Sequence, residues 1–471
     1  MPSQTNPSAD DAGHDAWVAA AARSLKGADL GTLVTRTAEG VEIRPLYDAA
    51  APAEARRDAI GWDIRVRIPA ADAAAANARA HEALGGGASS LLLEIGSIGS
   101  AADMARALDG VVLEAAPAAL DAGFCGPLAA EWLAEAGKGS PAARLGLHLD
   151  PLGAFAAAGR SPGPVEAHVQ RAAEAAGALA PAYPQASLFL ASGRAAHEAG
   201  GSPAEELGMM AAAAAAYARA LGAVGLPPDH ALPRIVLGLS VDQQLLVSVA
   251  KLRAARRIWA RIAGACGVEA PAQIEARSSQ RMLTAADPWT NLLRLTLAGF
   301  AGAVGGADAL VLGSFTDALG APTELTRRLA RNTQLILAEE AHLGRVADAM
   351  GGAWAIEALT NQLARQGWNC FQAIEREGGL AAALNSGALS AEVATVRRAR
   401  EAAVAEGVLP ILGVTRFPDP EPLPVEVEPA AEVHGGWRPE VRLPGPDDHC
   451  PALAPIRVSM AAEQVLGDLQ P

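Results

Sequence analysis

Residues 187–200 read SLFLASGRAAHEAG, an apolar run typical of a buried strand, followed by a small turn that carries Arg194, His197 and Glu198. An imidazole titrates near neutral pH, and a guanidinium binds carboxylates through two parallel hydrogen bonds. The turn could therefore bind an anion and move a proton. The same three residues could equally serve a surface or an interface, since a turn with polar side chains does not define a site.

A second group of chemical interest is His148, which ends another apolar run two residues before Asp150. The two could form a catalytic pair or a structural one. The nucleophile, zinc-protease, P-loop and dinucleotide-binding signatures are all missing from the sequence. The run 447–450 reads DDHC, but it lies in a proline-rich segment without further ligands at suitable spacing. We therefore expect no metal site.

Composition excludes several classes of partner. The 471 residues carry a formal charge of −14, which argues against binding to nucleic acid or to an anionic membrane. No window reaches the roughly 18 uninterrupted apolar residues that a membrane span needs. The four cysteines are far apart and form no C-x-x-C pair, and the N-terminus lacks a targeting pattern. We expect a cytoplasmic protein with reduced thiols.

The elements that would position these side chains alternate regularly along the chain. Continuous apolar runs are typical of strands that are buried on both faces, and the helical stretches between them would supply the crossovers of a parallel sheet. Eight such runs predict an α/β fold, a (β/α)8 TIM barrel, with its active site at the carboxyl ends of the strands. The expected strands are 89–95, 110–115, 143–149, 186–192, 234–240, 272–276, 308–313 and a weak one at 344–348.

Two extensions flank the predicted barrel, which we place at residues 70–407. Residues 1–69 form an N-terminal arm, with a helix over about 15–26 and a hairpin of 32–37 with 41–45. Residues 408–471 form an extended, proline-rich, acidic tail, and a last helix at 459–469 could dock it back.

Within the barrel, one helical stretch carries basic residues that we expect around its exposed side. A solvated face with local ion pairs is the simplest interpretation, and a surface for a phosphate or an acidic partner is the alternative. The residues are Lys251, Arg253, Arg256, Arg257 and Arg261.

Several motifs together resemble one known family. They are RSSQRMLTAADPWTNLLR at 277–294 and the continuation to 380, SGRAAHEAG at 192–200, VAKLRAARRIWA at 249–260 and ILGVTRF at 411–417. The chain resembles the methylmalonyl-CoA mutase family over some 400 residues. The resemblance implies a barrel that threads an acyl-CoA along its axis and is capped by adenosylcobalamin. A radical rearrangement there interconverts methylmalonyl-CoA and succinyl-CoA.

The chain departs from the active members of this family where they touch substrate. Their turn reads S-G-Y-H-x-x-E-A-G, whereas Arg194 and Ala195 stand here in place of the tyrosine and histidine. Their Gln-Asn-Asp after the third strand corresponds to residues 148–150, and an arginine of the sixth-strand motif corresponds to Gln273. We therefore expect no catalytic, cofactor or metal-binding residue. The expected vestigial substrate positions are His148, Asp150, Arg194, Ala195, His197 and Gln273.

The resemblance also bears on cofactor and partner. Active single-chain members carry a C-terminal cobalamin-binding domain with an Asp-x-His-x-x-Gly loop, and we expect no such domain here, because Asp447-x-His449 is followed by Ala452 where glycine is needed. We expect no cofactor on this chain. The chain resembles the small, non-catalytic subunits of heterodimeric members, which implies a catalytic large subunit that holds adenosylcobalamin.

Two alternatives stay open from the sequence. The first is an active acyl-CoA mutase large chain that uses a separate cobalamin-binding subunit. The second is an unrelated aldolase-like barrel enzyme that uses His148 or His197.

Overall fold

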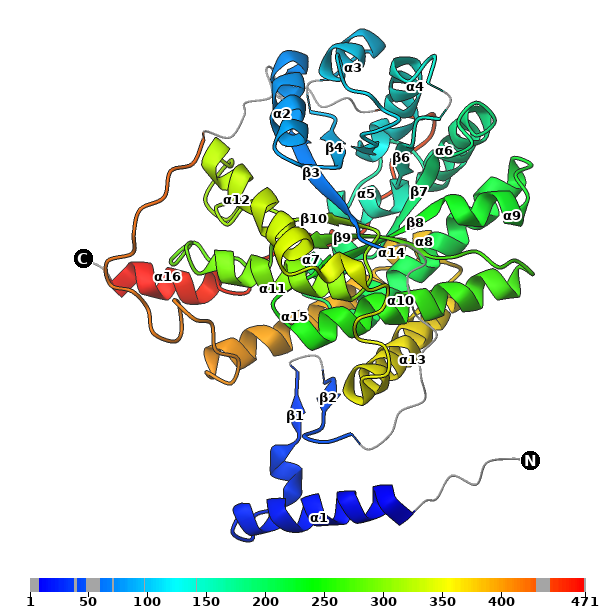
Figure 1. The fold of residues 1–471 in the computed structure, drawn as a ribbon. Coiled ribbons are helices and arrows are strands. Elements are labelled where there is room, and N and C mark those ends of the chain that lie inside the picture. The colour runs from blue at the N-terminus through cyan, green and yellow to red at the C-terminus, as the bar shows by residue number, and fades with distance from the viewer. Residues whose placement is uncertain are drawn as a thin grey trace.

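The centre of the molecule is a closed barrel of parallel strands that follow one another around the ring, with β10 meeting β3 (Figure 1). The computed structural model describes residues 8–37, 40–47, 60–69, 72–96, 98–140, 142–428 and 441–469. The predicted (β/α)8 barrel is confirmed. Its eight strands are β3 (Asp63–Pro69), β4 (Ser90–Glu94), β5 (Ala118–Asp121), β6 (Leu145–Leu149), β7 (Ser187–Ser192), β8 (Ile235–Val241), β9 (Gln273–Ser278) and β10 (Ala309–Val311).

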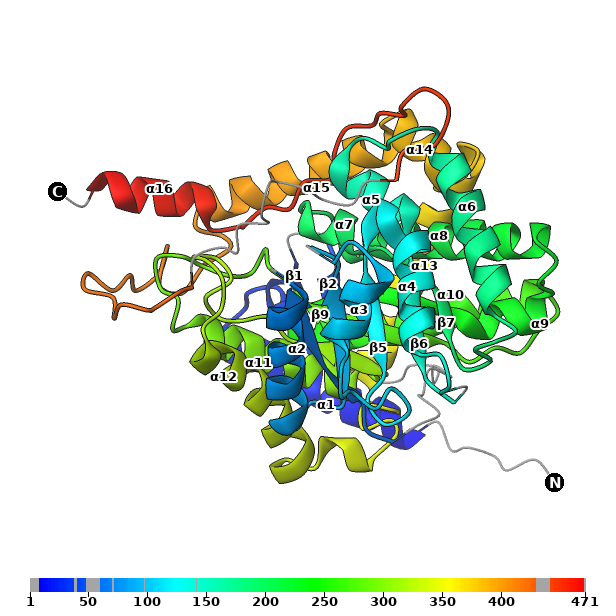
Figure 2. The same ribbon diagram turned by 90° about the horizontal axis from the view of Figure 1, so that it is seen from above.

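Helices surround the barrel and supply the crossovers between its strands (Figures 1 and 2). The start of α8 follows local chemistry, because Ser202 and Glu205 form a capping box with Pro203 at the first helical position. The helices are α2 (Ala73–Gly85), α3 (Ala101–Ala107), α4 (Gly126–Ala136), α5 (Pro151–Ala158), α6 (Val165–Leu179), α7 (Arg194–Glu198), α8 (Pro203–Ala223), α9 (Pro228–Ala231), α10 (Leu245–Ala265), α11 (Asn291–Val304), α12 (Glu324–Leu335), α13 (Trp354–Arg376), α14 (Leu380–Asn385) and α15 (Ala388–Ala405).

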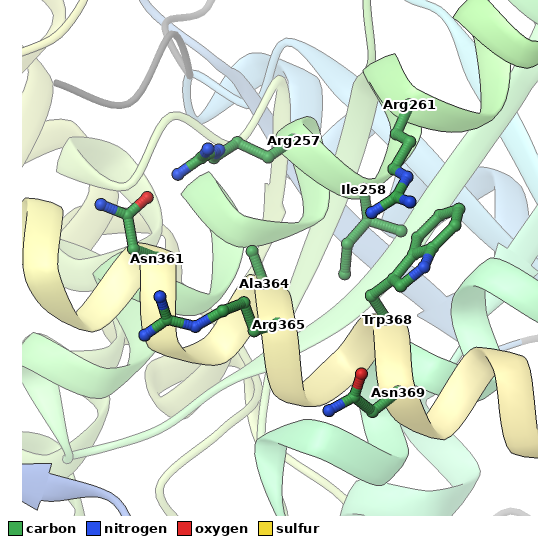
Figure 3. Close-up of a pocket in the computed structure, with 8 residues that line it drawn as sticks. All are labelled: Arg257, Ile258, Arg261, Asn361, Ala364, Arg365, Trp368 and Asn369. Carbon is green, nitrogen blue, oxygen red and sulfur yellow. The ribbon is translucent and has the colours of Figure 1, made fainter. Parts of the chain in front are cut away.

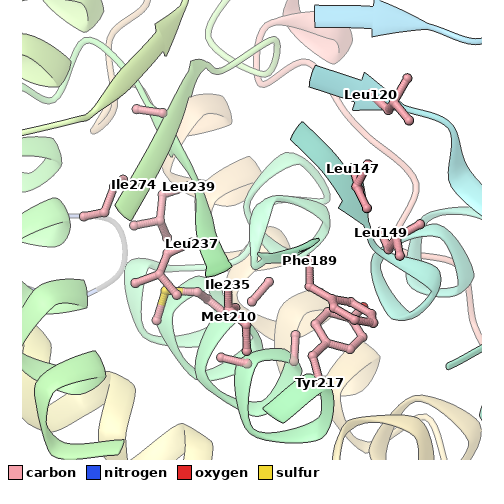
Figure 4. Packing of buried hydrophobic residues seen from close by; sticks show 14 of the residues in the cluster. Leu120, Leu147, Leu149, Phe189, Met210, Tyr217, Ile235, Leu237, Leu239 and Ile274 are labelled. Atoms are coloured by element: carbon pink, nitrogen blue, oxygen red, sulfur yellow. The ribbon is translucent and has the colours of Figure 1, made fainter. Parts of the chain in front are cut away.

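The main hydrophobic core lies between the outer faces of the strands and these helices (Figure 4). The rings of Phe189 on β7 and Tyr217 on α8 stack with their centroids 4.4 Å apart. Four consecutive alanines of α8, at 211–214, are fully buried, and their small side chains let this helix approach the strands closely. The core thus fixes the positions of the strand ends, which carry the candidate site.

Two of the eight strand predictions were wrong, and the barrel strands β3 and β5 were not predicted. The first strand of the barrel is β3, within the segment assigned to the arm, so the barrel begins at Asp63 and not at residue 70. Its alternating charges do not form the continuous apolar run that is typical of a strand buried on both faces. Residues 110–115 lead through a turn to the true strand β5, and residues 344–348 overlap the 3-10 turn Leu343–Arg345. Short apolar runs do not distinguish strands from turns.

The arm and the tail contain the elements predicted for them. The arm consists of α1 (Ser8–Ser24), a 3-10 turn and the antiparallel hairpin of β1 (Thr35–Arg36) and β2 (Glu42–Ile43). No described residue between 13 and 36 is buried. The tail is extended and ends in α16 (Met460–Leu469).

The basic helix differs from its prediction. Three of its cations are buried and paired inside the protein, because α10 is covered by β8, α8 and α13. Lys251 contacts Glu206, Arg253 contacts Glu357, and Arg256 contacts Asp308. Only the last two basic residues of the set, Arg257 and Arg261, reach the surface.

Candidate functional site at the carboxyl ends of the strands

A cavity of about 370 Å³ opens at the carboxyl ends of the barrel strands. This is where active sites form in this fold, because the loops after the strands converge there. Four of the predicted positions line the cavity: His148, Asp150, Arg194 and Ala195.

The turn after β7 presents two different faces to its surroundings. Arg194 and Ala195 face the cavity at the start of α7. Burial lowers the pKa of Arg194, and the neighbouring Arg277 lowers it further. Ala195 offers only a methyl group, which neither moves a proton nor donates a hydrogen bond to a thioester oxygen.

His197 lies on the opposite face of the turn, outside the cavity. It is 1% exposed, its Nδ1 lies 3.0 Å from Oε2 of Glu206, and its Nε2 lies 2.9 Å from Oγ of Ser279. Burial, with the nearby guanidinium of Arg281, lowers the pKa of His197, so the imidazole is neutral at pH 7. The residue joins α7 to α8 and to the loop after β9, which is a structural role.

Glu198 lines the cavity, but its carboxylate is committed to backbone and hydroxyl groups. Oε2 accepts hydrogen bonds from the backbone N–H groups of Gln280 and Arg281, each at 3.1 Å. Oε1 accepts one from the hydroxyl of Ser240 at 3.3 Å. Glu198 therefore fixes the loop after β9 against the turn, and has little capacity left to act as a base.

His148 forms the floor of the cavity. The register between β6 and β7 shifts between Gly146 and Leu149, and His148 has a φ of +43°, a conformation that residues other than glycine adopt rarely. Burial lowers the pKa of His148 to about 4, although the carboxylate of Glu275, 3.6 Å from its Nδ1, acts in the opposite direction. The side chain is therefore neutral near pH 7.

Asp150 is not paired with His148. It caps the N-terminus of α5 by accepting the backbone N–H of Gly153 at 3.0 Å, and Oδ1 accepts the hydroxyl of Tyr217 at 2.5 Å. Burial raises the pKa of Asp150 to about 7, against the lowering effect of the Tyr217 hydrogen bond. The structure thus splits the predicted His148–Asp150 pair into two separate contacts.

Ion pairs cross the barrel at the cavity, whose lining includes Asp121 and Arg277. Nη1 of Arg277 on β9 lies 2.5 Å from Oδ2 of Asp121 on β5, and these two strands are four places apart in either direction around the eight-stranded ring. Glu275 on β9 accepts hydrogen bonds from Nε of Arg277 at 2.7 Å and from Nη1 of Arg65 on β3 at 2.6 Å. Burial opposes the charge of Glu275, but the guanidinium of Arg277 outweighs it and lowers the pKa of this carboxyl well below its ordinary value.

A second cavity, of about 820 Å³, opens at the amino ends of the strands. Gln273 lines it at the start of β9, so the structure does not bring this residue together with Arg194 and Ala195. His148 lines both cavities, and Arg65 and Glu275 line the second one. The charged side chains therefore separate the two openings along the barrel axis.

These charged residues of the barrel interior were missed by reasoning from the sequence. The signal was present, because Asp63, Arg65 and Arg67 alternate with apolar residues on β3. Glu275 and Arg277 alternate in the same way on β9. Alternate residues of a strand point to the same face, so charges with a period of two in a barrel strand predict a polar interior.

The end of the tail covers the rim of the first cavity, which Leu453 and Pro455 line. The backbone N–H of Leu453 donates to the carbonyl of Ala156 at 2.8 Å, and that of Ile456 donates to the carbonyl of Glu198 at 2.8 Å. The tail is therefore tied to α5 and α7, directly above the carboxyl ends of the strands.

The two aspartates of the DDHC run make contacts within the protein. Asp447 is paired with Arg160 and Arg442, and Asp448 accepts the backbone N–H of Val165. Over the described ranges, no three His, Cys, Asp or Glu side chains gather as a metal-binding group. Among the same residues, no helix is both long and apolar enough to cross a membrane.

Comparisons with known proteins agree with this architecture. The profile of the methylmalonyl-CoA mutase family matches residues 93–434. The chain is 38% identical to the methylmalonyl-CoA mutase small subunit of Streptomyces virginiae, over 92% of this chain and 74% of that protein. It is 38% identical to a probable small subunit of Mycobacterium tuberculosis, over 82% of this chain and 66% of that protein.

A third relative is the methylmalonyl-CoA mutase small subunit of Propionibacterium freudenreichii subsp. shermanii, 30% identical over 83% of this chain and 64% of that protein. The chain thus spans between about two thirds and three quarters of the length of these relatives. Family membership also removes the alternative of an unrelated aldolase-like barrel. The chain belongs to the methylmalonyl-CoA mutase family.

Proposed function

We propose that this chain is a non-catalytic, scaffolding subunit of an adenosylcobalamin-dependent methylmalonyl-CoA mutase. Its partner in a heterodimer is a catalytic large subunit, which interconverts methylmalonyl-CoA and succinyl-CoA in the cytoplasm. The observation that carries the proposal is the ion pair between Arg277 and Asp121, which spans the barrel between opposite strands. The similarity to proteins named small subunits supports the pairing with a larger chain.

The ion pairs argue against an acyl-CoA along the barrel axis. A thioester that passed through the barrel would have to separate Glu275, which is 1% exposed, from Arg65 and Arg277. Breaking a buried ion pair costs about 3–5 kcal/mol, because it leaves a charge without its partner in a medium of low polarity. At the rim, Ala195 supplies no hydrogen-bond donor for the thioester oxygen.

The residues at the carboxyl ends of the strands do not fit a corrin ring stacked on this face. Leu453 and Pro455 line the rim of the cavity, and backbone hydrogen bonds tie the tail to α5 and α7. Of the residues that line this cavity, only His148 is a histidine, and it lies at the floor, with Nδ1 directed at Glu275. We therefore propose that cobalamin binds only to the partner chain, and we assign no step of the reaction to this one.

Co-purification and turnover test this function. Mixed with the catalytic large subunit, the chain should co-elute in size-exclusion chromatography as a one-to-one complex. The complex with adenosylcobalamin should isomerise succinyl-CoA, whereas this chain with adenosylcobalamin alone should not. Separate elution of the two chains would contradict the proposal. Turnover by this chain with a separate cobalamin-binding subunit would favour an active large chain instead.

A restored turn provides the matched variant for this test. Arg194→Tyr combined with Ala195→His supplies the residues that active family members have at these two positions, as the motif comparison implies. We expect this variant also to be inactive when assayed alone, because the ion pairs of Arg277 still cross the barrel. Measurable isomerase activity of the variant would show that only the turn, and not the closed axis, separates this chain from the active enzymes.

A further inference from the structure

A groove between α10 and α13 gathers cations that form no ion pair with an acidic side chain in the described part of the chain. Its cavity measures about 340 Å³ and is lined by Arg257 and Arg261 of α10 and by Arg365 and Trp368 of α13 (Figure 3). No ion pair formed by the described residues involves any of these three arginines. This is unusual in a chain with a net charge of −14, where a free cation readily meets a carboxylate.

The groove is a rigid feature of the fold. α10 and α13 pack against each other along much of their length, and Nη2 of Arg253 lies 2.6 Å from Oε1 of Glu357 between them. The guanidinium of Arg261 stands over the ring of Trp368, with 3.9 Å from Cζ to the ring centroid. This cation–π contact orients one cation before any ligand arrives, which lowers the entropic cost of binding.

The polar groups are spread along the groove and not focused on one point. Asn361, Arg365, Trp368 and Asn369 recur on one face of α13 at the spacing of successive helical turns. From residue 361 to residue 369 the helix rises by about 12 Å. Figure 3 shows Arg257, Asn361 and Arg365 at one end of the groove, and Arg261, Trp368 and Asn369 at the other. Two cationic ends separated in this way match an extended segment with two carboxylates better than a compact anion.

The position of the groove indicates where such a segment comes from. The N-terminal arm leaves the barrel on the side of α10 and α13 (Figure 1), and none of its described residues between 13 and 36 is buried. An exposed arm and an unpaired cationic groove on one side of the molecule are both typical of a surface that another chain covers.

We infer that the α10–α13 groove binds an acidic, extended segment of the catalytic subunit. This inference rests on the proposed function, because it names the surface through which the scaffold recognises its partner. Carboxylates of the segment pair with Arg257 and Arg365 at one end and with Arg261, held on Trp368, at the other. The side chain of Asn369 offers a hydrogen bond to the backbone of the segment.

The test compares two double variants of the full chain in their association with the catalytic subunit. Arg257→Gln with Arg365→Gln removes two cations of the groove. Arg328→Gln with Arg398→Gln removes the same charge from exposed sites on α12 and α15 outside the groove. The dissociation constant is measured by surface plasmon resonance at about 50 mM and about 300 mM NaCl, a range that changes screening between exposed charges. Circular dichroism verifies that all proteins are folded.

The groove variant should bind the catalytic subunit at least about tenfold more weakly than the wild type at low salt, and its affinity should depend less on salt. The control variant should change affinity less than about threefold. Equal affinity and equal salt dependence of wild type and groove variant would overturn the inference and leave the proposed function intact. Failure of the wild type to bind at all would instead overturn the proposed function.

A parallel titration with inorganic pyrophosphate tests whether the groove binds a small anion and not a segment of the partner. We expect pyrophosphate at millimolar concentration to leave the melting temperatures of the wild type and the groove variant equally unaffected. If it stabilises the wild type alone, while subunit affinity is the same for both proteins, the groove is a site for a small anion and the inference is wrong.

Discussion

Glu206→Gln is expected to lower the free energy of unfolding by about 3–5 kcal/mol, the usual cost of removing one partner of a buried ion pair. Glu206 is fully buried at the start of α8, and its Oε2 lies 2.5 Å from Nζ of Lys251, which is 2% exposed. Burial opposes the carboxylate charge, but the ammonium of Lys251 outweighs it and holds the pKa of Glu206 well below its ordinary value. The substitution leaves the ammonium of Lys251 buried without its counter-charge.

Urea unfolding at pH 7 measures this loss of stability. Two further variants show whether the loss comes from the buried ion pair. Glu375→Gln removes the partner of Arg219 in an exposed pair on the surface, with side-chain exposures of 58% for Arg219 and 29% for Glu375, and should cost less than about 1 kcal/mol. Adding Lys251→Met to Glu206→Gln removes both charges and should recover part of the loss. A cost for Glu206→Gln no larger than that of the surface variant would show that the buried pair does not stabilise the fold.

Gly193→Ala is expected to destabilise the protein by on the order of 3 kcal/mol or more, because the turn and α8 are in direct backbone contact. A Cβ at residue 193 would lie 1.9 Å from the carbonyl oxygen of Glu206. The turn cannot retreat from α8 without losing the hydrogen bond from the backbone N–H of Gly193 to the carbonyl of Gly238 at 3.0 Å.

Gly264→Ala is the matched control, because a Cβ at residue 264 of α10 meets no atom within 4 Å. Alanine favours the helix over glycine by up to about 1 kcal/mol, so this variant should be at least as stable as the wild type. Both glycine variants are compared with the wild type by their urea midpoints. Equal midpoints for Gly193→Ala and the wild type would mean that the turn shifts away from α8 at no cost.

The elements that depend on local signals could be predicted from the sequence. The apolar runs of β7 and β8 and the capping box of Ser202 and Glu205 depend on neighbouring residues, and the structure confirms them. The first barrel strand was assigned to the arm, because the charges of Arg65 and Arg67 resemble an exposed strand until a partner inside the barrel is known.

The predictions for charged residues were wrong where the residues form ion pairs with partners that are distant in the sequence. Lys251 meets Glu206, which is 45 residues away in sequence, and Arg253 meets Glu357, which is 104 residues away. No local pattern reveals such partners, so the basic stretch of α10 resembled a solvated face. At the candidate site, the sequence indicated that Arg194 and Ala195 face a cavity, but not that Arg277 reaches Asp121 across the barrel.

The closed barrel axis is tested most directly by counting acyl-CoA molecules bound to the assembled complex. Equilibrium dialysis of succinyl-CoA at saturating concentration against the heterodimer should give one molecule per complex, held by the catalytic subunit. We expect this number because Glu275, Arg65 and Arg277 close the barrel axis of the present chain. Two molecules per complex would show that a thioester enters this barrel as well, and would contradict the assignment of a scaffolding role.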